Sequence, residues 1–298
     1  MKQITIISGK GGTGKTTLAA CLAELLSDKV MADCDVDAAD LHLLLHPTVR
    51  EEGVFKGLKT AHINPEKCIE CDRCIEACRY DAISPYVVDP SSCEGCGLCT
   101  LVCPADAVEM VERISGRWFV SDTEHGPMAH AKLGIAQENS GLLVSAVRKR
   151  ARQIAERNAL RYVLIDGPPG IGCPVISSLA DVDLVLVVTE PTLSGIHDMI
   201  RVLDLVNYFK IGCAVCVNKS DINEKNTAEI RQYCRERDVP IVGEIPFDEN
   251  VVRALVRGQA VTGYGDGPAT KAIKAMSKRL QVLLDRIPEK AGASAQSG

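Results

Sequence analysis

Eight of the fourteen cysteines fall into two copies of one spacing pattern that suits metal clusters. Gaps of two residues let successive thiolates of one loop reach several corners of an iron-sulfur cube, while the distant last cysteine of each copy reaches the other cube. We therefore predict two [4Fe-4S] clusters. One is held by Cys68, Cys71, Cys74 and Cys103, and the other by Cys78, Cys93, Cys96 and Cys99. A structural zinc site is the alternative, because four thiolates also bind Zn²⁺.

A glycine-rich loop that suits phosphate binding follows the first apolar run, Gln3 to Ile7. Such a loop turns backbone N–H groups inward, and the helix that follows adds positive potential at its N-terminus. Lys15 is predicted to contact the β and γ phosphates, Thr16 to bind Mg²⁺, and Thr17 to reach the α phosphate. The predicted nucleotide-binding residues of this loop are Gly9, Lys10, Gly11, Gly12, Thr13, Gly14, Lys15, Thr16 and Thr17.

Three aspartates follow or end apolar runs that read as buried strands. They are Asp33, Asp35 and Asp166. The carboxyl ends of parallel strands meet at one edge of a sheet, where a metal-bound triphosphate needs carboxylates. We therefore predict a Mg²⁺-nucleotide site at this edge, with Thr16, Asp33 and Asp166 near the metal.

Strand-like and helix-like segments alternate along most of the chain. Short valine-rich and isoleucine-rich runs are separated by segments of helical periodicity, such as 142–157. This alternation predicts an α/β fold with a doubly wound, mostly parallel sheet. Between about Gly57 and Gly116 the composition changes to closely spaced cysteines and prolines, which indicates an insert. The predicted divisions are 1–57 and 118–288 for the nucleotide-binding domain, 58–117 for a small α+β insert, and 289–298 for a disordered tail.

The overall composition narrows the class of function. The net charge of −5 and the pI near 5.8 argue against a broad nucleic-acid-binding surface. The basic run Arg148-Lys149-Arg150 is expected to be a solvated helix face. Neither a signal peptide nor a membrane-length apolar run is recognisable, so a cytoplasmic protein without membrane association is expected. Cysteines at cluster spacing fit that reducing compartment better than disulfides do.

The phosphate loop carries an extra lysine, Lys10, and in this it resembles the MinD/ParA ATPases, which include Mrp and the nitrogenase iron protein. Residues 33–37 resemble the first switch of that family, and residues 166–170 resemble its Walker B aspartate and second switch. The resemblance implies catalytic roles for Lys10, Lys15, Asp35 and Asp166. Lys10 would reach the phosphates of a partner in an ATP-dependent homodimer, Asp35 would orient the attacking water, and Asp166 would hold Mg²⁺ through water. Asp40 departs from the asparagine usual in MinD-like chains.

Asn218 and Lys219 resemble the adenine-contacting segment of the same family, and Pro246 belongs to a second segment that flanks the base. Asp221 leaves a guanine-reading alternative, but the loop variant favours ATP. The cysteine repeats resemble bacterial two-cluster ferredoxins, with Arg79 in place of the first proline. Cys173 has the same offset from Asp166 as a cluster ligand of the nitrogenase iron protein, so a bridging cluster is a minority hypothesis.

The remaining cysteines are expected to be buried side chains of the core. Cys21, Cys34 and Cys234 fall on predicted core elements, and Cys213 and Cys216 lie in one strand with side chains on opposite faces. Residues 271–287 form an amphipathic pattern that is expected to pack against the sheet.

The main functional hypothesis is an ATPase that couples hydrolysis to iron-sulfur electron transfer or cluster assembly on an acceptor protein. One alternative is a MinD/ParA-like positioning ATPase whose clusters sense redox state. The other is an iron-sulfur scaffold with weak hydrolysis.

Overall fold

The computed structural model describes residues 1–134 and 140–288. Its centre is a mixed sheet in the order β3-β4-β5-β2-β6-β1-β7-β8-β9. The seven strands from β5 to β9 in this order run parallel to one another, whereas β4 is antiparallel to both β3 and β5. The predicted mostly parallel α/β fold is therefore confirmed. The strands are β1 (Lys2–Ser8), β2 (Lys29–Asp33), β3 (Thr48–Ile63), β4 (Val108–Thr123), β5 (Gly126–Leu133), β6 (Tyr162–Pro169), β7 (Leu184–Thr189), β8 (Cys213–Asn218) and β9 (Ile241–Ile245).

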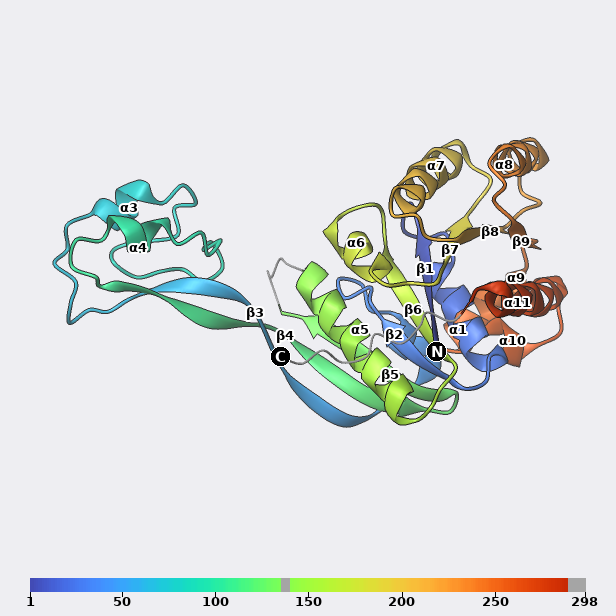
Figure 1. The fold of residues 1–298 in the computed structure, drawn as a ribbon, viewed down its shortest axis with the longest axis horizontal. Coiled ribbons are helices and arrows are strands. Elements are labelled where there is room, and N and C mark those ends of the chain that lie inside the picture. Colours follow the sequence, from blue (N-terminus) through green and yellow to red (C-terminus); the bar gives the residue numbers. More distant parts are fainter. Residues whose placement is uncertain (135–139, 289–298) are drawn as a thin grey trace.

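Helices cover both faces of the sheet (Figure 1). One face packs on α1 (Lys15–Leu25), α2 (Leu41–Leu45), α9 (Glu249–Val256), α10 (Val261–Tyr264) and α11 (Pro268–Arg286). The other packs on α5 (Ser140–Arg157), α6 (Cys173–Leu179), α7 (Leu193–Tyr208) and α8 (Glu224–Glu236). The central strands are buried on both sides, which explains why they read as continuous apolar runs. The expected packing of α11 is confirmed, since Ile273, Met276, Leu280 and Leu284 are buried.

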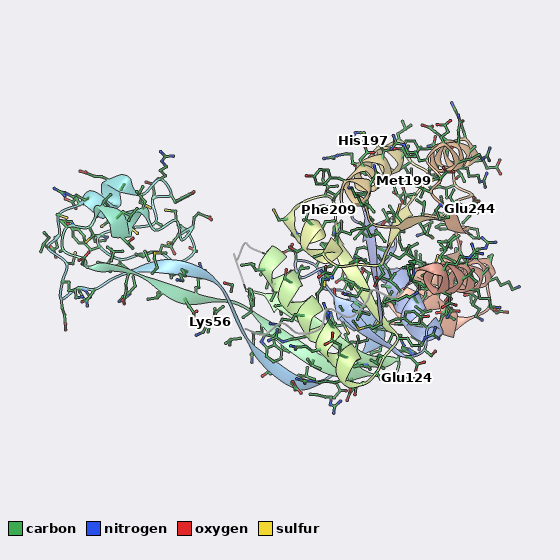
Figure 2. The ribbon with its side chains drawn as sticks, viewed as in Figure 1. Lys56, Glu124, His197, Met199, Phe209 and Glu244 are labelled. Atoms are coloured by element: carbon green, nitrogen blue, oxygen red, sulfur yellow. The ribbon has the colours of Figure 1, made fainter. Side chains whose placement is uncertain are left out.

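Strands β3 and β4 form a long antiparallel ribbon that leaves the body of the molecule (Figure 1). Strand β5 supports β4 only from Gly116 to Thr123. Beyond Gly116 the two strands continue alone, and the register shifts near Phe55 and Lys56 at the same place. Lys56 lies on the free part of the ribbon (Figure 2). The predicted insert limits, 58 and 117, fall beside these irregularities.

Residues 64–107, here called the tip, close the far end of the ribbon. They contain two short helices, α3 (Arg73–Ala77) and α4 (Leu98–Val102), which pack on each other. A small apolar cluster under these helices includes Ile63, Cys74, Ile83 and Val108. The tip therefore has its own core, separate from the cores of the two sheet faces.

One surface prediction is wrong. Arg148 is buried, and its guanidinium donates to the backbone oxygens of Ser177 and Ala180 and to Gln3 Oε1. It lies one helical turn from Val144 and Ala151, so helix geometry places it on the buried face of α5. The tail predicted at 289–298 lies outside the described residues. Among the described helices, none has the length and apolar character needed to cross a membrane.

Candidate nucleotide site and cysteine-bearing tip

The phosphate loop connects β1 to α1 at the carboxyl edge of the sheet. Gly12 and Gly14 have φ angles of +80° and +89°, a conformation that glycine adopts without steric cost. A Cβ at Gly14 would also lie 2.4 Å from Asn218 Nδ2, so a side chain here would displace the Asn218 amide. The loop can therefore keep its backbone N–H groups turned toward a phosphate.

A pocket of about 470 Å³ lies beside this loop. Val251, Val252, Leu255 and Ile273 supply an apolar wall that suits a flat base. Predicted residues that line it are Gly11, Gly12, Thr13, Gly14, Lys15, Thr16, Thr17, Asp35, Asn218 and Lys219. Gly9, Lys10 and Pro246 are not among its lining residues, nor are Asp33 and Asp166. The structure thus brings most, but not all, of the predicted nucleotide residues to one cavity.

Buried carboxylates surround the lysine that is predicted to bind phosphate. Lys15 Nζ lies 2.7 Å from Asp166 Oδ1, 3.3 Å from Asp35 Oδ2 and 3.2 Å from Thr16 Oγ1. Burial opposes the charge of Lys15, but the attraction of Asp166 and Asp35 outweighs it and raises the lysine pKa. Burial, followed by repulsion from Asp166, raises the pKa of Asp33 well above its ordinary value.

The same carboxylates fit a magnesium ion. Oδ2 of Asp33 and Oδ2 of Asp166 are buried and have no hydrogen-bond partner among the described residues. A buried polar atom without a partner is costly, and Mg²⁺ is a hard cation that is usually bound by one or two carboxylates together with water. Together with the hydroxyl of Thr16, these atoms form a donor set of oxygens only, which is the set that Mg²⁺ takes.

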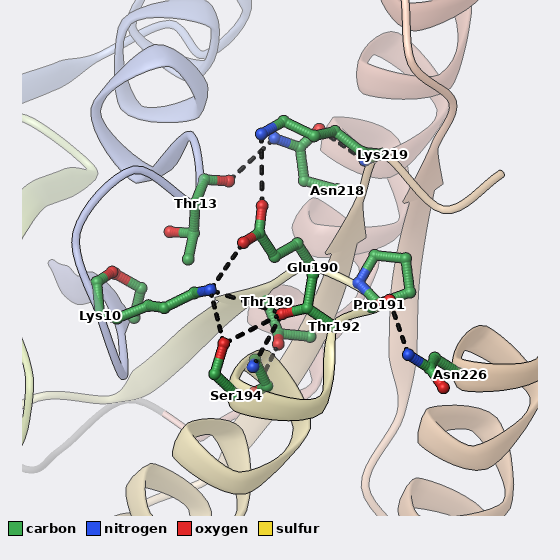
Figure 3. A network of polar contacts seen from close by, with 12 residues as sticks. Lys10, Thr13, Thr189, Glu190, Pro191, Thr192, Ser194, Asn218, Lys219 and Asn226 are labelled. Carbon is green, nitrogen blue, oxygen red and sulfur yellow. Dashed lines mark hydrogen bonds and ion pairs between the residues drawn. The ribbon is translucent and has the colours of Figure 1, made fainter. Parts of the chain in front are cut away.

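Lys10 makes its contacts on the other side of the loop (Figure 3). Its ammonium group lies 2.8 Å from Glu190 Oε1 and 2.9 Å from Ser194 Oγ. Glu190 Oε2 also lies 3.2 Å from Lys219 Nζ. The sequence reasoning did not assign a role to Glu190, although it follows β7 directly, the same position after a strand that marked Asp33.

The loop after β8 is joined to the phosphate loop. Asn218 donates its side-chain amide to the backbone oxygen of Thr13 over 2.8 Å. Asp221 Oδ1 accepts the backbone N–H of Phe247 over 2.7 Å, so this carboxylate is engaged by its own chain. Asp221 Oδ2 remains able to accept a further hydrogen bond, so the choice between adenine and guanine stays a prediction that rests on the loop variant.

The two cysteine repeats of the tip have the same backbone conformation at equivalent positions, 25 residues apart in the sequence. Glu70 and Gly95 are both left-handed, and so are Asp72 and Gly97, and Asp81 and Asp106. The same offset relates helix α3 to helix α4. The tip is therefore an internal duplication in structure as well as in cysteine spacing.

The four cysteines of each predicted cluster line a separate small pocket. Cys68, Cys71, Cys74 and Cys103 line one, and Cys78, Cys93, Cys96 and Cys99 line the other. The backbone N–H of Ala107 donates to Cys103 Sγ over 3.3 Å, and that of Ala82 donates to Cys78 Sγ over 3.4 Å. In the described parts of the chain, no three His, Cys, Asp or Glu side chains are grouped so that they could hold one metal ion.

The tip also carries a charge excess. Its residues include eight Asp and Glu against three Lys and Arg, a net charge of −5, which equals the net charge of the whole chain. The positive and negative charges of the body and the ribbon therefore cancel. Ion pairs cross the ribbon between Lys56 and Glu112 and between Arg117 and Glu52, whereas none is found within the described tip.

A second pocket, of about 400 Å³, lies between the switch-like segment and the root of the ribbon. Val36, Asp37 and His42 line one side, and Phe119 of β4 and His130 of β5 line the other. The rings of Phe119 and His130 stack with centroids 5.1 Å apart. Burial lowers the pKa of His130 to about 4, so this ring is neutral at physiological pH. Val36 and Asp37 of the switch-like segment 33–37 thus share one cavity with β4, the strand that leads to the tip.

The cysteines outside the repeats lie largely as expected. Cys21, Cys34, Cys216 and Cys234 are buried, and burial raises the pKa of each thiol. Cys213 and Cys216 pack on opposite faces of the sheet, as strand alternation predicted. Cys173 is exposed at the start of α6. Whether Cys173 binds a metal stays a hypothesis.

Comparison with known proteins agrees with this architecture. Residues 4–261 match the family model described as the CobQ/CobB/MinD/ParA nucleotide binding domain. An uncharacterized protein of Methanocaldococcus jannaschii is 32% identical over 288 residues, which cover 95% of this chain and 97% of the relative. The cytosolic Fe-S cluster assembly factor NBP35 of Eremothecium gossypii is 30% identical over 151 residues, 45% of each chain.

Among solved structures, the septum site-determining protein MinD of Pyrococcus horikoshii, complexed with Mg-ADP, has a TM-score of 0.61. The match covers 97% of this chain and 99% of that chain at 18% identity, so it supports the fold alone. The family model spans most of the chain, including the phosphate loop and the base-side loop. This chain therefore belongs to the CobQ/CobB/MinD/ParA family of nucleotide-binding proteins.

Proposed function

We propose that this protein is a Mg²⁺-ATP-dependent dimeric ATPase that couples nucleotide binding and hydrolysis to iron-sulfur electron transfer or cluster assembly at its tip. The observation that carries the proposal is the shared cavity between residues 36–42 and the root of the ribbon. A phosphate-dependent movement of the switch-like segment would change the packing around Phe119 of β4. Since β4 continues into the tip, the nucleotide site and the cysteines are joined by one strand.

In the ATPase reaction, Lys15 would turn from Asp166 to the β and γ phosphates of bound ATP. Asp166 and Asp33 would then face Mg²⁺ and its water, and Asp35 would orient the water that attacks the γ phosphate. Lys15 keeps its charge in the absence of nucleotide because Asp166 and Asp35 raise its pKa. The preformed backbone of the loop supplies N–H donors at no cost of rearrangement.

At the tip, the two ligand sets support two [4Fe-4S] clusters over a single-ion zinc site. One Zn²⁺ needs four sulfurs around one point, whereas a cube takes one thiolate at each of four irons. Backbone N–H groups aimed at Cys78 and Cys103 are donors of the kind that stabilise cluster thiolates. Bound clusters would supply one-electron carriers, and a reducing compartment such as the cytoplasm suits them.

The expected partners are a second copy of the chain and an acceptor protein. The uncompensated charge of the tip supports an acceptor with a basic docking surface, because complementary charge accelerates encounter. The partial similarity to an iron-sulfur cluster assembly factor favours assembly as one form of the coupling. The resemblance of the phosphate loop and of residues 33–37 and 166–170 to the MinD/ParA ATPases favours the second candidate function, a positioning ATPase with redox-sensing clusters.

The deciding experiment is cluster EPR and redox potential of anaerobically purified protein without nucleotide, with Mg²⁺-ADP, and with a non-hydrolysable ATP analogue. A shift of the potential between ADP and the analogue is the expected result. Equal potentials, together with equal accessibility and acceptor affinity, would refute the coupling. If nucleotide-dependent association with a membrane or a division partner then survived replacement of the cluster cysteines, the positioning function would replace it.

A further inference from the structure

Lys10 belongs to the phosphate loop, yet its ammonium group is held outside the phosphate pocket. It lies within hydrogen-bond reach of Glu190 Oε1 and Ser194 Oγ, at 2.8 and 2.9 Å, and lies 3.4 Å from Thr192 Oγ1. An ammonium group has three N–H donors. Three protein oxygens therefore surround Lys10 without any phosphate.

Glu190 holds two cations at once. Its second oxygen lies 3.2 Å from Lys219 Nζ, and the carboxylate is only 13% exposed. Burial opposes ionisation of Glu190, but the hydrogen bonds from Lys10 and Lys219 outweigh it and keep its pKa below the ordinary value. The three groups carry one positive charge in excess.

Because two lysines pair with the single carboxylate of Glu190, Lys10 can leave this group of three side chains. When Lys10 leaves, Glu190 keeps Lys219 as its partner, so no partly buried carboxylate is left unpaired. Removing the sole partner of a buried charge is strongly unfavourable, and the second lysine avoids that penalty. Lys219 also lies in the nucleotide pocket, next to Asn218, which is tied to the phosphate loop.

We propose that Glu190, together with Lys219, is a parking site for Lys10 that sets how readily the ATP-bound chain pairs with a second copy of itself. The inference rests on the proposed function, in which Lys10 contacts the ATP of the second copy. Glu190 is thus a positioning residue that acts through Lys10. Its carboxylate competes with the partner's nucleotide phosphates for one ammonium group.

Two substitutions should change dimerisation in opposite directions. Glu190→Gln removes the charge that holds Lys10, so half-maximal dimerisation should require about two- to fivefold less protein, the range of a partly exposed ion pair. Lys219→Met leaves Lys10 as the only cation at Glu190, so dimerisation should require more protein. A misfolded variant would dimerise less, so a loss of folding could not be mistaken for the tighter dimerisation predicted for Glu190→Gln.

The measurement is sedimentation velocity of the full anaerobic protein over a range of concentrations, with a non-hydrolysable ATP analogue and, separately, with ADP. The binding of a fluorescent ATP analogue to the monomer is measured for each variant, because Lys219 lines the nucleotide pocket. Glu244→Gln is the matched control, since Glu244 pairs with Arg231 on the surface, at 2.5 Å, away from the loop.

A second readout needs no dimer. In nucleotide-free monomer, an amine-reactive label should modify Lys10 faster in Glu190→Gln than in wild type, while the labelling of Lys274 stays the same. Peptide mass spectrometry measures both rates. An unchanged labelling rate, or unchanged or weaker dimerisation of Glu190→Gln, would overturn the parking site. If wild-type protein labelled as expected but did not dimerise with the analogue, the dimeric ATPase itself would be refuted.

Discussion

The ammonium group of Lys15 and Oδ1 of Asp166 lie 2.7 Å apart, although 151 residues separate them in the sequence. Lys15 begins α1, and Asp166 lies in β6, the strand that pairs with β1. Both side chains are almost fully buried. The end of the phosphate loop and strand β6 are therefore joined by a buried pair of opposite charges.

Lys15→Met should abolish hydrolysis and also weaken the fold. Without Lys15, Asp166 and Asp35 lose the cation with which they pair, and breaking a buried pair costs about 3–5 kcal/mol. Phosphate release and urea denaturation at pH 7 measure the two effects. The control is Lys274→Met, which breaks only the exposed pair with Asp266. Equal stability of Lys15→Met and wild type would contradict the buried pairing.

Asp33 should make the stability of the nucleotide-free fold depend on pH. Because its pKa in the folded state is raised, its contribution to stability is present below the unfolded value, near about 4, and is lost as the pH rises through the folded value. Asp33→Asn should therefore be more stable than wild type at pH 7 and similar at pH 3.5. Thermal unfolding without Mg²⁺ or nucleotide tests this, and a difference independent of pH would contradict it.

Cysteine replacements should follow the crossed ligand sets. Wild-type protein should contain about eight irons per chain. Cys103→Ser should remove the same EPR signal as Cys68→Ser, although Cys103 lies in the second repeat, and it should leave the signal that Cys93→Ser removes. Cys216→Ser, in the buried strand β8, is the control and should keep all the iron. Loss of the Cys93-dependent signal in Cys103→Ser would show that the ligands do not cross.

Phe119→Ala should uncouple the two ends of the molecule. The substitution removes the ring of β4 that lines the cavity shared with the switch-like segment. ATP hydrolysis should therefore persist, whereas the nucleotide-dependent shift of the cluster potential should disappear. Phe209→Ala is the matched control, because Phe209 lies at the end of α7, away from the ribbon (Figure 2). The coupling route is wrong if the shift survives in Phe119→Ala at wild-type size.

The sequence predicted the central strands and the phosphate loop because buried parallel strands read as continuous apolar runs. It did not predict the length of β3, since Thr48–Ile63 faces solvent on much of both sides and shows no apolar alternation. An exposed Arg148 was wrongly predicted because only the charge of the side chain was considered. The helical spacing from Val144 and Ala151, which places Arg148 on the buried face, was not considered. Glu190 was missed because its two lysine partners, Lys10 and Lys219, are distant in the sequence and meet only in the fold.

The charged pairs along the ribbon have a consequence for solubility. Strand β3 exposes unpaired N–H and C=O groups along its outer edge, and β4 does so beyond Gly116, where β5 no longer pairs with it. Such edges accept further strands from neighbouring molecules. The pairs Arg50–Asp122, Arg117–Glu52 and Lys56–Glu112 follow one another along the two strands. A neighbouring strand would have to strip water from these charges before it could pair. The ribbon can therefore extend from the body into solvent without becoming a template for aggregation.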